Sequence, residues 1–96
     1  MPIRIERTAD VVARTGSSRS TLYLRIREGL WPKPVSIGAR AVGWPSNETD
    51  QLLAARIAGM SDDEIRELVC DLELARNAHR LSRRGDVNER NFRRPR

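Results

Sequence analysis

Basic and hydroxyl side chains gather in one short stretch of the sequence and recur a little further along it. The residues singled out are Arg19, Ser20, Thr21, Tyr23, Arg25, Arg27, Lys33 and Arg40. An arginine can donate two hydrogen bonds to a guanine edge or to a phosphate, and serine and threonine hydroxyls can serve bases or phosphates. These residue types therefore suit contact with a polyanion. The alternative interpretation is an ordinary solvated surface.

Other kinds of site lack the residues that they need. One cysteine, Cys70, and one histidine, His79, cannot form an internal disulfide or a zinc site built from both residue types. No arrangement predicts a nucleophile with its base, a glycine-rich phosphate loop or a metal site, so we expect no enzymatic activity and no cofactor. No apolar run approaches the roughly 20 residues of a membrane span, and no signal peptide is visible, so we expect a reducing cytoplasm.

Two short helices are predicted to position the first group of polar side chains. Thr8 can cap a helix over residues 9–14, and Ser17 or Ser18 can cap a second helix that runs to Glu28. The glycine between them interrupts the helical pattern. Two short helices separated by a glycine-containing turn have the dimensions of a helix-turn-helix.

The second helix is predicted to bury one side, which Leu22 and Ile26 share because they lie one turn apart. Other side chains point away from this side or flank it, and we expect them to be available for contact with a partner. They are Arg19, Ser20, Thr21, Tyr23, Leu24 and Arg27.

An extended linker and a hairpin are predicted to follow. The two prolines in residues 31–34 forbid a helix there. Residues 35–37 and 42–44 alternate as strands do, which predicts a β-hairpin with Arg40 at its tip. Both tryptophans, Trp31 and Trp44, border apolar neighbours and are expected in the core.

Two further helices are predicted after the hairpin. The first covers about residues 47–58, and its apolar face is made by Leu52, Leu53 and Ile57. The second begins at a capping box formed by Ser61 and Glu64 and reaches about residue 80 or 83. Its apolar positions at helical spacing are Ile65, Leu68, Val69, Leu72 and Ala75.

The formal net charge of +5 combines three unlike blocks. Residues 1–58 carry nine basic and five acidic side chains, residues 59–75 carry one and six, and residues 76–96 carry eight and two. Blocks of this kind indicate separate roles along the chain.

Three segments, in their order, resemble the AlpA-like regulators of phages and prophages, which are related to excisionases and MerR-type winged helix-turn-helix proteins. The segments are TGSSRSTLY at 15–23, EGLWPKPV at 28–35 and GARAVGW at 38–44. The resemblance spans roughly residues 3–58. It implies a mainly α fold with a small β-hairpin wing, that is, a winged helix-turn-helix, to which this chain adds a C-terminal helix.

This resemblance implies a sequence-specific DNA-binding protein of a phage or prophage, located in the bacterial host cytoplasm and associated with the nucleoid. Members act as excisionases, which bend attachment-site DNA and bias an integrase toward excision, as transcriptional regulators, or as both. The implied partners are double-stranded DNA and an integrase, and no membrane. The predicted divisions are a DNA-binding domain over 1–59, an acidic-to-basic helix over 60–84 and a basic disordered tail over 85–96.

In such a fold, the second helix enters the major groove with its N-terminal residues facing base edges. We expect Arg40 to reach the neighbouring minor groove or phosphates, and Arg25 and Lys33 to be weaker phosphate contacts. Tyr23 either bonds a phosphate or packs against its neighbours.

The acidic block has two interpretations. In one, it is the solvated side of a helix that Ile65, Leu68 and Leu72 pack onto the domain. In the other, Asp62, Asp63 and Glu67 contact the basic surface of the next copy, which gives head-to-tail assembly along DNA. A second class of function also stays open, namely an interaction module that recruits a protein through this helix, with DNA contact secondary.

Overall fold

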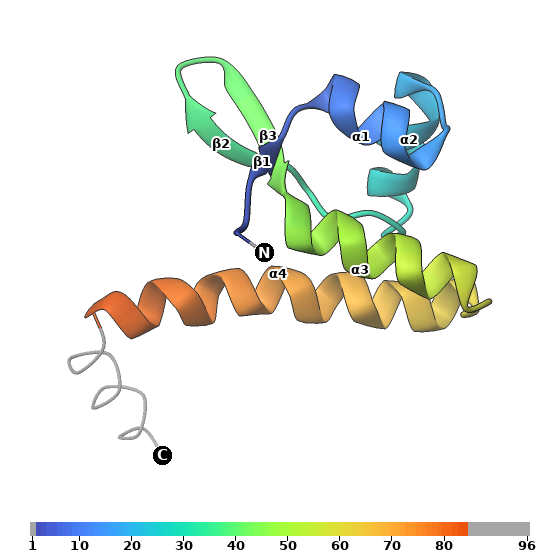
Figure 1. The fold of residues 1–96 in the computed structure, drawn as a ribbon. Coiled ribbons are helices and arrows are strands. Elements are labelled where there is room, and N and C mark those ends of the chain that lie inside the picture. Colours follow the sequence, from blue (N-terminus) through green and yellow to red (C-terminus); the bar gives the residue numbers. More distant parts are fainter. Residues whose placement is uncertain (1, 85–96) are drawn as a thin grey trace.

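Four helices and a three-stranded antiparallel sheet make up the part of the chain that the structure, a computed structural model, describes. It covers residues 2–84, with residues 78–84 as helix backbone only. The elements are β1 (Ile5–Glu6), α1 (Thr8–Thr15), α2 (Arg19–Arg27), β2 (Val35–Gly38), β3 (Ala41–Pro45), α3 (Ser46–Ile57) and α4 (Asp62–Arg84). The predicted fold class, a winged helix-turn-helix plus a C-terminal helix, is confirmed (Figure 1). The predicted tail, residues 85–96, lies outside the described residues.

The turn between α1 and α2 forms as predicted, with one correction at the start of α1. Arg7, rather than Thr8, is the N-cap. Its backbone is extended, and its N–H donates to the Asp10 carboxylate at 3.0 Å. Thr8 is the first residue of the helix. Gly16 ends α1 in the left-handed region, with φ at 71°. Ser18 is the cap of α2, one of the two serines predicted for that role.

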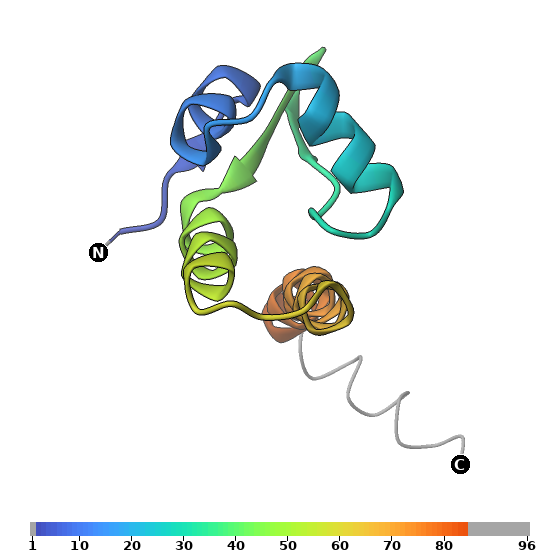
Figure 2. The ribbon, with the colours of Figure 1, turned by 90° about the vertical axis from the view of Figure 1, so that its right-hand side faces the viewer.

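The hairpin is the wing of the fold, and a strand that the sequence did not pair completes its sheet. β2 and β3 pair in antiparallel register, with Ser36 opposite Val42 and an irregularity at Ile37. β1 joins the other edge of β3, with Glu6 opposite Trp44. In the view of Figure 2, β3 passes between α1 and α2 and leads into α3. β3 therefore pairs with β2 on one edge and with β1 on the other, and it leads directly into α3.

Gly43 permits the close approach of β1 and β3. A Cβ atom at this position would lie 2.5 Å from Cγ2 of Ile5 and 2.8 Å from the carbonyl oxygen of Glu6. The second contact is with backbone, which cannot rotate away. The small residue at this point of β3 is therefore a requirement of the sheet.

The core collects apolar side chains from every helix and from the linker. Its buried members are Val11, Leu22, Leu30, Trp31, Trp44, Leu52, Ala55, Ile65, Val69 and Leu72. The prediction that both tryptophans are core residues is confirmed. Trp44 has no exposed surface, and its Nε1–H donates to the carbonyl oxygen of Pro32 at 2.8 Å. The linker after α2 is thereby fixed to the base of the wing.

The predicted apolar face of α3 is wrong at Ile57, which is 86% exposed. Ile57 follows Leu52 by five positions, about 1.4 turns, so it points away from the side that Leu52 buries. The buried side instead includes Thr49 and Ala55, and Leu53 is half-buried. In α4, the predicted apolar position Ala75 is also exposed.

A buried ion pair joins α4 to α3. Arg76 donates to both carboxylate oxygens of Glu48, at 2.8 and 2.6 Å, and Glu48 is only 3% exposed. At the other end of α4, the predicted capping box is confirmed: the Ser61 N–H donates to Glu64, and the Glu64 N–H donates to Ser61. Neither α4 nor any other helix among residues 2–84 has the length and apolar character of a membrane span.

Gly43→Ala is expected to lower the free energy of unfolding by about 1–3 kcal/mol, because the new methyl group would overlap the backbone of β1. Urea denaturation measures this effect. Ser36→Ala, at an exposed position of β2, is the control and should change stability by less than about 0.5 kcal/mol. Equal stability of the two variants would show that β1 does not pack closely on β3.

Glu48→Ala is expected to lower the free energy of unfolding by about 3–5 kcal/mol, because it leaves the Arg76 guanidinium without its partner in a part-buried site. Asp63→Asn breaks the exposed pair of Asp63 with Arg66 and should cost about 1 kcal/mol or less. The same denaturation measurement compares the two. A small loss for Glu48→Ala would mean that α4 is held without this pair.

Candidate nucleic-acid interface

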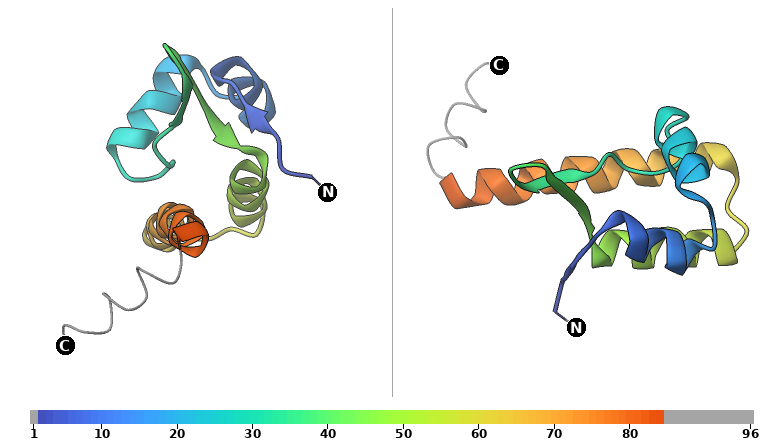
Figure 3. Two further views of the ribbon diagram at one scale, coloured as in Figure 1. Left: turned by 90° about the vertical axis from the view of Figure 1, so that its left-hand side faces the viewer. Right: turned by 90° about the horizontal axis from the view of Figure 1, so that it is seen from above.

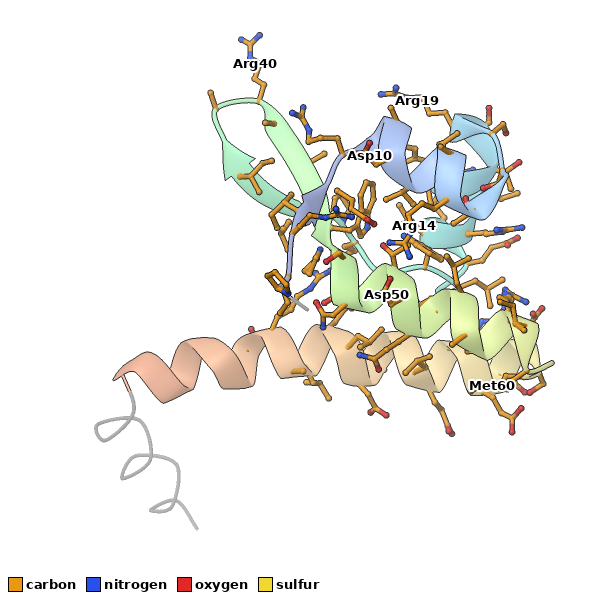
Figure 4. All side chains as sticks on the ribbon, viewed as in Figure 1. Asp10, Arg14, Arg19, Arg40, Asp50 and Met60 are labelled. Atoms are coloured by element: carbon orange, nitrogen blue, oxygen red, sulfur yellow. The ribbon has the colours of Figure 1, made fainter. Side chains whose placement is uncertain are left out.

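The structure brings the two arginines expected to matter most to one side of the molecule. Arg19 is the first residue of α2, and Arg40 lies in the turn between β2 and β3. Both side chains are exposed and lie across the domain from α4 (Figure 4). We call this the reading side, defined by Arg19 and Arg40.

The start of α2 is held in shape by its own side chains. Ser18 Oγ accepts the N–H of Thr21 at 3.1 Å, and its hydroxyl donates to Thr21 Oγ1 at 2.9 Å. Thr21 is half-buried. Because its Oγ1 accepts the hydrogen bond from Ser18, its own hydroxyl hydrogen can still be donated. Arg19 and Ser20 are exposed beside it. Unpaired backbone N–H groups at a helix N-terminus favour a phosphate nearby.

The rest of α2 divides its side chains between the core and solvent. Tyr23 is half-buried and packs against the core, so it does not point away from the domain as predicted, and packing is the alternative that the structure shows. Leu24 and Arg27 are exposed, as expected. Arg25 is half-buried. Basic groups on α2 face no acidic residue within the helix itself, because residues 19–27 include none.

Lys33 stands apart from the reading side. It is exposed, but its backbone N–H donates to the Glu73 carboxylate of α4 at 2.9 Å. Its side chain lines a small cleft together with Arg66 and Glu73. The structure therefore places Lys33 beside α4 and does not bring it together with Arg40.

Arg7 is a basic residue that the sequence interpretation missed. Its Nε–H donates to the carbonyl oxygen of Val42 in β3 at 3.1 Å, and the residue is exposed. It joins the start of α1 to the wing. The available signal was an arginine directly before a helix, but its position beside the wing depends on the pairing of β1 with β3.

Arg14 is structural rather than available to a ligand. It donates to the buried carboxylate of Glu6 at 2.7 Å and also pairs with Asp50 of α3. The hydrogen bonds to Asp50 and to Glu6 raise the pKa of the Arg14 guanidinium above its ordinary value. The charged form is thus favoured, and α1 is fixed to both the sheet and α3.

The acidic residues of α4 are partly occupied within the chain. Asp62 lies 3.3 Å from Arg56, and Asp63 lies 3.2 Å from Arg66. Glu67 is exposed and makes no ion pair within the described residues. Packing of this helix through Ile65 and the leucines that follow is confirmed. Self-association through Asp62, Asp63 and Glu67 stays a prediction.

Comparison with known proteins matches a family to the part of the chain that precedes α4. The family model described as "Prophage CP4-57 regulatory protein (AlpA)" matches residues 4–57. A curated relative, the uncharacterized protein ORF88 of Enterobacteria phage P4, is 43% identical over 56 residues, which are 58% of this chain and 64% of the relative. The chain thus spans less than two thirds of that relative. No solved structure matches.

Proposed function

The chain belongs to the AlpA family of prophage regulatory proteins, and we propose that it binds specific double-stranded DNA sites of a phage or prophage through its reading side. The observation that carries this proposal is the exposure of Arg19 and Arg40 on one side of the domain, at the start of a helix and at the tip of a wing. The major groove of B-DNA is wide enough to admit an α-helix or a two-stranded β-ribbon.

The proposed contacts follow from the order of residues along α2. Arg19, Ser20 and Thr21 face base edges in the major groove, where arginine recognises guanine and hydroxyls serve either bases or phosphates. Arg40 enters the neighbouring minor groove or contacts its phosphates. Arg27 and Arg25 lie further along α2 and support the same duplex through phosphates. Arg7, beside the wing, is added to this set.

The distribution of charge supports one orientation on DNA. α2 carries three arginines and no acid. α4 carries six acids and one arginine over residues 62–73 and lies across the domain from the reading side (Figure 4). A polyanion is therefore attracted to one side and repelled by the other, which steers the encounter before any base is read.

Excision is the finer function that we propose, and transcriptional regulation is the alternative within the same contacts. A helix and a wing that occupy adjacent grooves hold a bent duplex when binding requires both to engage. In the excisionases that the sequence resembles, such a bend at an attachment site biases an integrase toward excision. The second candidate is a module that recruits a protein such as an integrase through α4, favoured by the exposed Glu67 and Leu74 of that helix.

Arg19→Ala is expected to weaken binding by roughly 5- to 150-fold, as the loss of one base contact does. The measurement is a mobility shift with a duplex that the wild-type protein has selected from random-sequence DNA. Arg56→Ala is the matched control, because Arg56 pairs with Asp62 beside the start of α4. Unchanged binding by Arg19→Ala, or an equal loss in the control, would contradict the proposed reading side.

Arg40→Ala is expected to make the negative slope of log affinity against log salt concentration less steep by about one, because one cation–phosphate contact is lost. The preference of the protein for its selected sequence should persist if the wing touches only phosphates. An unchanged slope together with unchanged affinity would show that the wing tip stays clear of DNA.

Addition of the protein to integrase and attachment-site DNA is expected to raise the yield of excised circles, and Arg19→Ala is expected to remove that increase. A promoter reporter tested with the same two proteins measures the alternative. Response of the reporter without any change in excision would assign the protein to transcriptional regulation.

A further inference from the structure

α2 is held in the core by one fully buried side chain. Within this helix, Leu22 is buried, whereas Tyr23 and Ile26 are half-buried. A single buried position fixes where a helix lies but constrains its direction less. Arg19 lies three residues before Leu22 and Arg27 lies five after it, so a tilt of about 10° moves their Cα atoms in opposite directions by roughly 1 Å each. Such a movement exceeds the roughly 0.5 Å range of hydrogen-bond lengths.

A turn at Gly29 separates α2 from the next buried residues. Gly29 adopts the left-handed region, with φ at 78°, and its N–H donates to the carbonyl oxygen of Ile26 at 3.1 Å. Leu30 and Trp31, which follow, are both buried and anchor the chain after the turn. The direction of α2 therefore depends on what holds the turn itself.

Arg66 of α4 covers this turn. Its Nε–H donates to the carbonyl oxygen of Glu28, the last residue before the turn, at 2.9 Å. Its stem lies over Gly29, because a Cβ atom built there would be 3.7 Å from Cγ of Arg66 and 3.8 Å from Cδ. Asp63 accepts a further hydrogen bond from Nη1 of Arg66 at 3.2 Å. A cation at this place is favoured, since the last carbonyl groups of a helix carry partial negative charge.

Apolar packing between α4 and the end of α2 is interrupted, so polar contacts span the space between them. A cleft of about 200 Å³ lies there, with Ile26 and Val69 among its lining residues. The carboxylate of Glu73 accepts the backbone N–H of Lys33 at 2.9 Å, and Glu73 follows Arg66 by seven positions, about two turns of α4. Both views of Figure 3 show the segment after α2 alongside α4. α4 thus holds this segment at its beginning and at its end.

Both parts of the reading side meet in this segment. α2 enters it at Glu28, and the wing is fixed to it by Trp44, whose Nε1–H donates to the carbonyl oxygen of Pro32 at 2.8 Å. A change of angle at the turn therefore moves Arg19 relative to Arg40.

We propose that Arg66 is a positioning residue for DNA reading: its bond to Glu28 sets the direction of α2, so that Arg19 and Arg40 engage one duplex together. Arg66 acts through α2 rather than on DNA, because α4 lies across the domain from the reading side (Figure 4). It also lies beyond the family match, which ends at residue 57. The reading role rests on the proposed function, whereas the holding of α2 does not.

Residual dipolar couplings of the isotope-labelled full chain without DNA test the holding of α2. In the wild type, the couplings of α2, β3 and α3 are expected to fit one alignment. Arg66→Met keeps a stem over Gly29 but has no donor for Glu28, so its α2 couplings are expected to depart from that fit while those of β3 and α3 remain.

Arg56→Met is the matched control for these couplings. It removes the same charge, and Arg56 also pairs with an acid at the start of α4, Asp62, but from α3. Its couplings are expected to equal those of the wild type. Unchanged α2 couplings in Arg66→Met, or an equal change in Arg56→Met, overturn the proposal.

Affinities for two duplexes test the reading role. For the selected duplex, Arg66→Met is expected to bind roughly 3- to 20-fold more weakly, which is part of what one base contact contributes. For an unrelated duplex its affinity should equal that of the wild type, and the salt dependence should be unchanged for both duplexes, because no phosphate contact is lost. A fold that is merely less stable would weaken binding to both duplexes alike. Arg56→Met should match the wild type on each.

Two results of the binding measurement overturn the reading role. Equal losses on both duplexes with a less steep salt dependence would make Arg66 a phosphate contact. Wild-type affinity for the selected duplex, despite altered α2 couplings, would show that the direction of α2 does not matter for reading. Failure of the proposed function is distinct from both: the wild type then selects no duplex, and the couplings still decide whether Arg66 holds α2.

Discussion

The burial of Trp44 fixes the relation between the wing and the helix that precedes it. Its indole is fully buried, and the Nε1–H donates to the Pro32 carbonyl oxygen at 2.8 Å. Its backbone faces Glu6 across the sheet, and the next residues begin α3. One side chain thus joins the linker after α2, the base of the wing and the start of α3. The position of Arg19 on α2 relative to Arg40 on the wing depends on this contact of Trp44 with Pro32.

The same core separates two surfaces of opposite character. Leu22 from α2 and Ile65 from α4 are both buried in it, and each helix turns its charged side chains to solvent. α2 leaves arginines and hydroxyls in solvent, and the first half of α4 leaves acids. A net charge of +5 hides this division. The family match ends at residue 57, yet the core of this chain requires side chains from α4.

Local signals in the sequence predicted the local structure well. Ser18 and the pair Ser61 and Glu64 are caps as predicted, because capping depends on residues three positions apart. The hairpin and the burial of both tryptophans also followed from short patterns. The site residues on α2 could be placed on a side of that helix, except for Tyr23, whose packing depends on neighbours outside α2.

Contacts between distant residues could not be predicted in this way. The pairing of β1 with β3 depends on the absence of a side chain at Gly43, and it joins Ile5 to Pro45, which lie 40 positions apart in the sequence. The pair of Glu48 with Arg76 spans 28 positions, and no local pattern links them. The correction at Ile57 has the same origin, because the neighbours of α3, among them α4 and β3, decide which side of this helix is buried.

The central claim is that α2 and the wing form one DNA-reading surface from which α4 is excluded. Amide chemical shifts of the isotope-labelled protein, measured with and without its selected duplex, test this most directly. The account predicts shift changes at residues 19–27 and 39–41, with the amides of residues 62–73 unchanged. Changes confined to α4, with α2 and the wing unaffected, would contradict it.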